Sequence, residues 1–310
     1  MSDPAARLPD PDLHDWCQAM EDLCDEDGYF EPLGPALSTR HWAFFHDDGP
    51  RLLVTFEDLA TIRARPDQRP MGREIALARG WSHLCLIADG PTWYRDPAVF
   101  GYVDRLVDDA FFEDFDSVLF YGAGTSGHAA CAFSVAAPGA QVLAINPRAT
   151  LDPALAGWDR RDIAARRLDF TSRYGFAPDM TEGAARLNLL YDPTSREDAM
   201  HAALFRAPWI TRHAIPRLGA GAEQALLMSG LLAPLIDAAM EGTLDPAQFA
   251  RLWRARRNLG PYLRALVDAA EAQGHPARAL RICRHVTART DAPRFRRRQQ
   301  ALEAALTAAD

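Results

Sequence analysis

The segment best suited to chemistry is a short glycine-rich turn, GAGTSG, at residues 122–127. It follows a β-rich run at residues 117–121 (SVLFY) and precedes a helical pattern at residues 128–137. Glycines let a backbone approach a ligand closely, and the N–H groups at a helix N-terminus attract an anion or an acyl oxygen. The turn therefore predicts either an anion-binding site or a sharp elbow that presents a catalytic group.

One alternative is dinucleotide binding, because these letters form a Gly-x-Gly-x-x-Gly pattern between a strand and a helix. Asn146 lies nineteen positions after Gly127, where such a unit places an acid for the ribose, and Arg148 could meet a 2′-phosphate. The acid itself is missing, a long stretch precedes the motif, and Pro147 interrupts the usual strand end. An NADP-type dinucleotide-binding protein remains an alternative prediction.

The longer run at residues 121–153, YGAGTSGHAACAFSVAAPGAQVLAINPRATLDP, resembles the elbow region of the α/β-hydrolase superfamily. That elbow reads Gly-x-Ser-x-Gly-Gly and places its serine on a strand-to-helix turn beside oxyanion-binding amides. In a gap-free alignment the matched positions are, in order, Gly122, Gly124 in place of the serine, Thr125 as the next amide, Ser126 and Gly127. The resemblance covers about residues 38–240. It implies an α/β fold with a mostly parallel sheet that opens antiparallel, and bacterial relatives associated with surface polysaccharides.

The resemblance also assigns the other members of a catalytic triad. Residues 187–193 (LNLLYDP) match the strand whose end supplies the acid, which makes Asp192 the candidate. The histidine should follow the strand at residues 209–215, but residues 217–222 (RLGAGA) contain none. Since two triad members are absent at their positions, the sequence predicts a catalytically degenerate protein. An active esterase or acyltransferase would have to use displaced residues, and Ser126, His128 and Asp192 are the candidates.

We expect such a degenerate protein to bind a small molecule or acyl group, or to act as a scaffold, with Gly122, Gly124, Thr125 and Gly127 at the ligand. Trp93 and Tyr94 follow a strand end, where loops line ligand sites, and they either contact the ligand or cover the sheet. Four acids lack the spacing of a cation-binding loop and are interpreted as surface charges: Asp152, Asp159, Asp162 and Asp169. No metal and no cofactor are predicted.

The composition excludes several kinds of chemistry. No residue is lysine, so Schiff-base chemistry and a phosphate-binding Walker lysine are excluded. The five cysteines match no zinc spacing and are expected to be reduced thiols of a cytoplasmic protein. An apolar run of about 18 residues is absent, and the N-terminus lacks the pattern of a secretory signal, so no membrane span is expected.

The order of the expected elements divides the chain into three regions. Residues 1–37 form a solvated lead-in, residues 38–242 an α/β-hydrolase-like core, and residues 243–310 an Arg-rich helical region. The core should open with a β-hairpin over residues 38–56, reversed at HDDGP, and contain a helical insertion at residues 157–186. Further strands are predicted at residues 83–88, 117–121, 141–145, 187–191 and 209–215, with helices at residues 72–80, 97–110, 128–137 and 197–205 and from residue 223.

Charge is distributed unevenly along the chain. Residues 251–298 hold thirteen arginines and three acids, a net charge of +10, whereas the whole chain carries −8. Helical patterns at residues 261–274 and 277–286 resemble one tetratricopeptide-type hairpin, which should pack on the core because a lone unit lacks neighbours. The positive charge could hold this hairpin to the acidic core or bind an acidic partner or RNA. Without a nucleic-acid motif we favour the internal role and expect no nucleic acid; a protein partner stays open, and the sequence does not indicate an oligomeric state.

Overall fold

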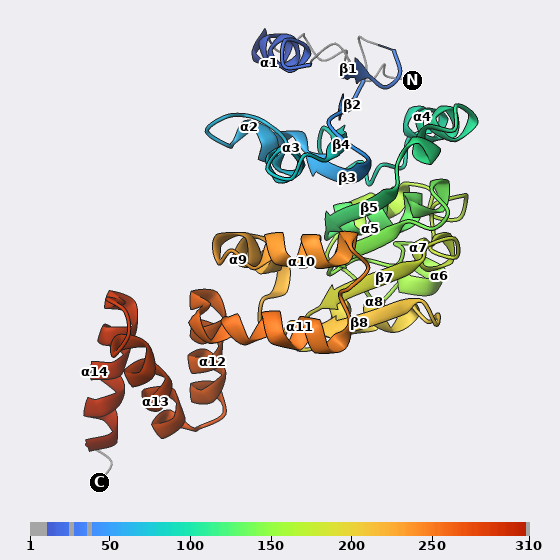
Figure 1. Cartoon of the computed structure of the whole chain (residues 1–310). Coiled ribbons are helices and arrows are strands. Elements are labelled where there is room, and N and C mark those ends of the chain that lie inside the picture. Colours follow the sequence, from blue (N-terminus) through green and yellow to red (C-terminus); the bar gives the residue numbers. More distant parts are fainter. Residues whose placement is uncertain (1–10, 25–27, 36–38, 308–310) are drawn as a thin grey trace.

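The computed structural model describes residues 11–24, 28–35 and 39–307, and its centre is an eight-stranded sheet covered by helices on both faces (Figure 1). The strand order is β1-β2-β4-β3-β5-β6-β7-β8. Strand β2 pairs antiparallel with β1 and β4, and every other neighbouring pair is parallel. The architecture is therefore α/β-hydrolase-like, as the elbow sequence predicts.

The strands are β1 (Tyr29–Pro32), β2 (His41–His46), β3 (Arg51–Asp58), β4 (Ser82–Ala88), β5 (Ser117–Ala123), β6 (Gln141–Ile145), β7 (Arg186–Tyr191) and β8 (Ile210–Ala214). The central ones are continuous apolar runs because helices cover the sheet from both sides. Every residue of β4 is buried, for example. On one face the core contains side chains from α4, α5 and α8, and on the other from α3, α9, α10 and α11.

The α-helices are α1 (Pro11–Glu21), α2 (Leu59–Arg63), α3 (Met71–Leu77), α4 (Pro97–Asp108), α5 (Thr125–Phe133), α6 (Pro153–Ala156), α7 (Ala177–Met180), α8 (Arg196–Leu204), α9 (Ala222–Met228), α10 (Leu232–Met240), α11 (Pro246–Leu252), α12 (Gly260–Ala272), α13 (Pro276–Thr287) and α14 (Pro293–Thr307). The 3₁₀ turns are η1 (Phe111–Asp114), η2 (Ser134–Ala136), η3 (Ile163–Arg167), η4 (Gly219–Gly221) and η5 (Trp253–Asn258). Within the described residues no single helix is long and apolar enough to cross a membrane, although the broken pair 219–228 and 232–240, bent by 91°, passes on length and composition together.

The predicted hairpin over residues 38–56 is wrong in its pairing, and its residue 38 lies outside the described residues. Strands β2 and β3 are joined by the expected turn, but β4 lies between them, antiparallel to β2 and parallel to β3. Cys85 of β4 faces Phe44 on one side and Thr55 on the other. The turn between β2 and β3 reverses the chain but does not require the two strands to pair, and β4 occupies the place between them. The antiparallel opening is instead the β1–β2 pair.

The lead-in is not a solvated segment where the structure describes it. Trp16 and Met20 of α1 are 4% and 2% exposed and pack with Trp42 and Phe44 of β2. The indole N–H of Trp16 also donates to the carbonyl oxygen of Gln68 at 3.0 Å. Residues 1–10, which carry the Pro-rich start of this prediction, lie outside the described residues. The region assigned to the sheet therefore begins before residue 38, because β1 belongs to it.

The predicted helical insertion at residues 157–186 contains little helix. Only η3 and the single turn α7 are helical there, and turns and bends make up most of the rest before β7. The segment is polar and Arg-rich without a helical apolar period, and Asp–Arg contacts described below hold it against the core. Its compact but irregular structure corrects the sequence prediction.

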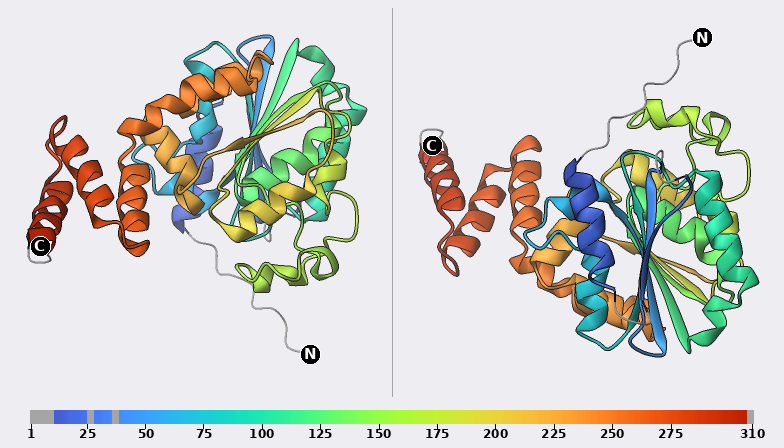
Figure 2. Two further views of the ribbon diagram at one scale, coloured as in Figure 1. Left: turned by 90° about the horizontal axis from the view of Figure 1, so that it is seen from below. Right: turned by 90° about the horizontal axis from the view of Figure 1, so that it is seen from above.

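The C-terminal helices α12, α13 and α14 project away from the sheet (Figure 2). They bury their own apolar cluster, which includes Leu263, Leu280, Cys283 and Phe295 and is separate from the clusters beside the sheet. The prediction that the hairpin packs on the core is therefore wrong for most of its apolar side chains, although Tyr262 of α12 does pack against the cluster that contains Trp253. The hairpin packs instead against α14. The sequence of α14 is mostly polar and Arg-rich, and its apolar residues Phe295 and Leu302 complete the cluster.

Candidate functional site

The turn after β5 is a strand-to-helix elbow with Gly124 at its apex. Gly124 has φ +57° and ψ −115°, between the last residue of β5 and the first residue of α5. Its N–H donates to the carbonyl oxygen of Ile145 at 2.8 Å, and its carbonyl oxygen accepts from the N–H of His128 at 3.1 Å. This strained backbone is the kind that an elbow uses to expose a nucleophile above the sheet. The position therefore presents backbone where a hydroxyl would ordinarily stand.

The other two glycines of the motif are needed for close packing. A Cβ on Gly122 would lie 2.2 Å from the carbonyl oxygen of Ser126, and one on Gly127 would lie 3.2 Å from the carbonyl oxygen of Gly122. A Cβ on Gly124, in contrast, would meet no atom within 4 Å. The elbow thus keeps open space at its apex, beside the N–H groups of the first turn of α5 that begin with Thr125.

The candidate acid Asp192 is buried at the end of β7 and bound to its own surroundings. Its Oδ1 accepts from the N–H and the hydroxyl of Thr194 at 2.8 and 2.6 Å, and its Oδ2 accepts from the N–H of Gly219 at 2.8 Å. Burial alone would raise the pKa of Asp192, but these hydrogen bonds and a backbone contact from Arg217 lower it. The carboxylate consequently holds the loop in which a hydrolase would carry its histidine.

Asn146, considered above for a ribose, completes the same arrangement. Its Oδ1 accepts from the N–H of Asp192 at 3.0 Å, and its Nδ2 donates to the carbonyl oxygen of Gly219 at 2.8 Å. Arg148 forms an ion pair with Asp162 and lies 5.1 Å above the ring of Trp93. Both side chains that the dinucleotide interpretation would use are therefore engaged within the protein.

The displaced candidates do not form a triad. The Ser126 side chain hydrogen-bonds to the hydroxyl of Tyr94, which itself donates to the carbonyl oxygen of Glu57 at 3.2 Å. His128 is 1% exposed, and its Nδ1 donates to the carbonyl oxygen of Arg148 at 2.9 Å. Burial lowers the pKa of His128 to about 4. Within the part of the chain that the structure describes, no hydrogen bond joins Ser126, His128 and Asp192 to one another.

Trp93 and Tyr94 are both 2% exposed and adopt positive φ angles of 57° and 55°. Trp93 packs edge-on against His128 and Phe170 at centroid distances of 5.6 and 5.7 Å. Tyr94 belongs to the core cluster over the α4–α5 face of the sheet. Tyr94 therefore covers the sheet, whereas Trp93 packs in a separate apolar cluster with Leu151, Ala165 and Phe170.

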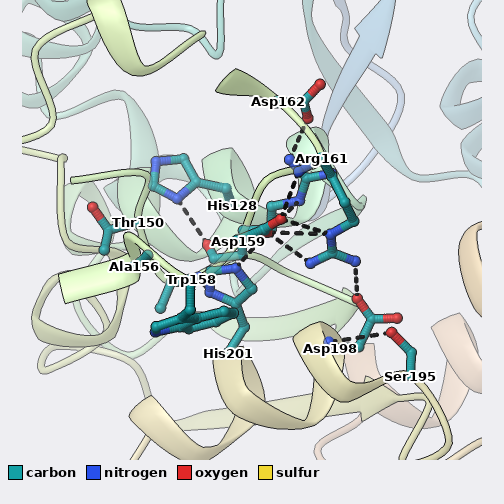
Figure 3. Close-up of polar contacts among 12 residues, drawn as sticks. His128, Thr150, Ala156, Trp158, Asp159, Arg161, Asp162, Ser195, Asp198 and His201 are labelled. Atoms are coloured by element: carbon teal, nitrogen blue, oxygen red, sulfur yellow. Dashed lines mark hydrogen bonds and ion pairs between the residues drawn. The ribbon is translucent and has the colours of Figure 1, made fainter. Parts of the chain in front are cut away.

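Sequence reasoning missed a buried ion cluster around Asp159 (Figure 3). Asp159 is 1% exposed and accepts from Arg161 Nη2 at 2.8 Å and from His201 Nε2 at 2.9 Å. Arg161 also pairs with Asp198 at the start of α8, and Ala149 N–H donates to His201 Nδ1 at 3.2 Å. The interpretation of Asp159 as a surface acid is therefore wrong.

This cluster fastens the irregular insertion to α8 and to the loop after β6. Burial alone would raise the pKa of Asp159, but hydrogen bonds from Arg161 and His201 and the charge of Arg148 hold it well below its usual range. Burial lowers the pKa of His201, so this imidazole is neutral at pH 7 and donates one N–H to the carboxylate. The run Asp-Arg-Arg-Asp at residues 159–162 was the available signal in the sequence.

A second missed group lies at the end of β3. The carboxylate of Glu57 accepts from the N–H groups of Met71 and Gly72 at 2.8 and 2.9 Å, at the start of α3, and lies 3.2 Å from Arg65. Nearby, the hydroxyl of Tyr121 donates to Glu223 at 2.6 Å. Burial raises the pKa of both carboxyl groups.

Glu57, His83 and Cys85 also offer ligand atoms within 4.8 Å of one another, as the only such group in the described residues. Both oxygens of Glu57 already accept N–H bonds, and His83 Nε2 hydrogen-bonds to Thr55 at 2.8 Å. A Cβ on Gly72 would lie only 2.3 Å from that nitrogen. The group is close-packed, and the Glu57 oxygens and His83 Nε2 are already used in hydrogen bonds, although His83 Nδ1 is buried without a partner among the described residues. We therefore assign no metal site to it.

Comparisons with known proteins give matches at the level of structure. No family model matches the chain, and no curated protein matches it. The capsule O-acetyltransferase of Neisseria meningitidis serogroup A is 11% identical, with 62% of this chain and 90% of that chain covered and a TM-score of 0.41. An S-formylglutathione hydrolase from Agrobacterium tumefaciens is 13% identical over 75% and 96% of the two chains, with a TM-score of 0.41. An acetyl xylan esterase from Paenibacillus sp. R4 is 14% identical over 74% and 96%, with a TM-score of 0.38.

The strand order, the parallel central sheet and the backbone of the elbow all indicate the same fold. The chain has an α/β-hydrolase fold, and the apex of its elbow is Gly124.

Proposed function

We propose that this protein is a non-catalytic α/β-hydrolase-fold protein that works by binding, as a scaffold or as a binder of an acyl group. The observation that carries the proposal is the backbone of Gly124, which has the geometry of a nucleophile elbow and no side chain. Covalent catalysis by this fold requires a nucleophile at the elbow, a base within hydrogen-bond reach and an acid to orient it.

The surroundings of the elbow support this proposal. Both carboxylate oxygens of Asp192 accept hydrogen bonds, one from Thr194 and one from Gly219. The loop that contains Gly219 has no histidine. His128 is neutral at pH 7, since its pKa lies near 4, but its Nδ1 bonds to a carbonyl oxygen. The imidazole of His128 packs against the rings of Trp93 and Phe170, and within the described residues no hydrogen bond joins it to Ser126.

A binding role retains what the elbow still offers. The space above Gly124 is open to a Cβ, and the N–H groups at the start of α5 have no partner in the preceding turn of a helix. Such amides bind an anion or an acyl oxygen. The relatives of polysaccharide-associated type implied by the elbow sequence suggest an acylated carbohydrate as one candidate ligand.

A fluorophosphonate probe and p-nitrophenyl acetate test the proposal. We expect the purified full chain to show no labelling and no hydrolysis above the buffer rate, with Ser126→Ala giving the same result. Stoichiometric labelling of the wild type that Ser126→Ala abolishes would replace the proposal with an active esterase or acyltransferase.

The dinucleotide alternative has its own test. We expect no change in NADPH fluorescence and no shift in melting temperature when the full chain is titrated with NADPH. Saturable NADPH binding that weakens in Arg148→Ala would instead establish a dinucleotide site at the GAGTSG turn.

A further inference from the structure

Two neighbouring grooves lie in the projecting C-terminal helices. The first has a volume of about 580 Å³ and is enclosed by the end of η5, α12, the end of α13 and the start of α14. The second has a volume of about 400 Å³ and lies between η5, α12 and α13. The linings share Arg257, Leu263 and His285, so together they form one surface, here named the arginine groove.

The arginine groove is strongly basic. Its lining contains no Asp or Glu, and it contains eight arginines, namely Arg256, Arg257, Arg264, Arg278, Arg281, Arg289, Arg294 and Arg297. None of these eight forms an ion pair with a residue that the structure describes. Eight uncompensated guanidinium groups on one surface produce a positive potential that attracts an anionic partner.

The acids of the same helices are used elsewhere. Asp268 and Glu271 pair with Arg298, Asp291 pairs with Arg296, and Glu303 pairs with Arg284. None of these three arginines lines the groove. The paired arginines and the unpaired arginines of these helices therefore lie at different positions, and α12, α13 and α14 project away from the sheet (Figure 2).

The floor of the groove is apolar. Leu263, Val286 and Phe295 are almost fully buried beneath the arginines, and Leu266 and Ile282 are partly exposed at the second groove. The lining follows α13 from Arg278 to Val286, a distance of about 12 Å at the rise of a helix. An extended peptide covers this distance with about four residues.

From this arrangement we propose that the arginine groove binds an acidic, partly apolar peptide segment of another protein. Guanidinium forks bind carboxylates in bidentate pairs, and the apolar floor accommodates Leu-type side chains between them. Single-stranded nucleic acid usually binds on exposed aromatic platforms, whereas Tyr262 is the one partly exposed aromatic side chain in this lining. This inference rests on the proposed scaffolding role, to which it adds a class of partner. Binding at the groove can nevertheless be measured independently of catalysis at the elbow.

Fluorescence anisotropy of the full chain with labelled nonapeptides tests the inference. The probes are Glu-Asp-Leu repeated three times, its Gln-Asn-Leu isostere, and a single-stranded oligonucleotide of twenty nucleotides. We expect the acidic peptide to bind at least tenfold more tightly than the isostere, and its affinity to fall as salt is raised from 50 to 300 mM. Binding of the oligonucleotide in preference to the acidic peptide, or equal binding of the two peptides, would overturn the proposal.

Matched charge reversals locate the site. Arg257→Glu/Arg281→Glu changes two exposed groove residues, while Arg160→Glu/Arg254→Glu makes the same change in charge at two exposed positions outside the groove. We expect the first variant to weaken acidic-peptide binding at least tenfold and the second less than threefold, with unchanged circular dichroism for both.

Equal losses of acidic-peptide affinity in the two charge-reversed variants would show non-specific electrostatic attraction and refute binding at the arginine groove. A dimer in light scattering that Arg257→Glu/Arg281→Glu dissociates, without peptide binding by the monomer, would assign the groove to a second copy of this chain instead. Fluorophosphonate labelling together with intact peptide binding would refute the non-catalytic proposal and leave the groove standing, so that the two failures are distinguishable.

Discussion

The carboxylate of Asp192 accepts a hydrogen bond of 2.8 Å from the backbone N–H of Gly219. In a working triad, an acid at the end of this strand orients an imidazole. Here it orients the loop after β8, and Asn146 reinforces the contact by binding both Asp192 N–H and the carbonyl oxygen of Gly219. In this structure, therefore, the side chain of Asp192 holds the loop after β8 in place.

Asp192→Asn tests this structural role. The new amide would place N–H donors against the N–H groups of Thr194 or Gly219, and an unmatched buried polar group costs about 1–3 kcal/mol. We expect the free energy of unfolding, measured with urea, to fall by that amount. Asp48→Asn, at an exposed turn, should change it by less than about 0.5 kcal/mol; equal effects of the two changes would contradict the assignment.

Two glycines with open surroundings should respond in opposite directions to alanine. Neither Gly124 nor Gly101 would bring a new Cβ within 4 Å of another atom, but Gly124 has φ +57° and Gly101 lies within α4. We expect Gly124→Ala to lower the free energy of unfolding by about 1–2 kcal/mol through backbone strain. Gly101→Ala should raise it by about 0.5–1 kcal/mol. Stabilisation by Gly124→Ala would show that the elbow is not held in the strained conformation.

Gly122→Ala should be far more harmful than Gly124→Ala. Its Cβ would overlap the backbone of Ser126, with the carbonyl carbon at 2.4 Å as well as the oxygen at 2.2 Å. The start of α5 must therefore move away from β5, and we expect a loss of more than about 3 kcal/mol or a failure to fold. Thermal denaturation followed by circular dichroism measures the difference, and a tolerated Gly122→Ala would refute this packing of the elbow.

Asp159→Asn should loosen the insertion. The change removes the buried negative charge that accepts from Arg161 and His201, while Arg161 keeps its ion pair with Asp198, so we expect a cost of about 1–3 kcal/mol. The pKa of Asp159 is lowered in the folded protein, so its contribution is present above the ordinary pKa of an aspartate and is lost as pH falls below about 4. We expect limited proteolysis to cut the variant within residues 152–176 first. Unchanged resistance there would contradict a fastening role.

Buried histidines should make the protein less stable in mild acid. Burial lowers the pKa of His41, His128 and His213 to about 4 and that of His83 to about 3. Below pH 6.5 these histidines bind protons in the unfolded chain but not in the folded protein. The free energy of unfolding therefore falls as pH is lowered from 6.5 towards 4. Glu57 and Glu223 act in the opposite direction because their pKa values are raised, but they are fewer.

The slope of the free energy of unfolding with pH measures this effect. Each histidine contributes at most about 1.4 kcal/mol per pH unit. His213→Gln removes one of the four and should flatten the slope between pH 6.5 and pH 4.5 by no more than that amount. If the free energy of unfolding instead increases as pH is lowered from 6.5 to 4.5, the carboxyl groups with raised pKa values dominate.

The local parts of this structure could be predicted from the sequence. The strands β4, β5, β6 and β7 are apolar runs bounded by turn residues, and the elbow and the place of Asp192 follow from the resemblance of two short segments to the α/β-hydrolase superfamily. The separation of β2 from β3 could not be read in this way, because a turn such as HDDGP reverses the chain without deciding which strand enters between its arms. The burial of Asp159 likewise depends on His201, which is 42 positions away in the sequence.

The C-terminal region shows the same limit at a larger scale. Arginine content alone did not distinguish the residues that pair with Glu271, Asp291 and Glu303 from those that face the groove. That distinction depends on how α14 packs against α13, which is a tertiary property. Predicting an internal role for this positive charge was reasonable from composition, but the structure leaves most of it uncompensated within the described residues.

The separate apolar cluster of α12, α13 and α14 has a consequence for the dynamics of the chain. Helices that bury their side chains mainly against one another can open together while the sheet stays folded. Amide hydrogens at Leu280 and Cys283 should then exchange with solvent through a sub-global opening, at a lower free energy than those of Leu119 and Leu143 in the central strands. Such an opening would change the arginine groove without disturbing the sheet.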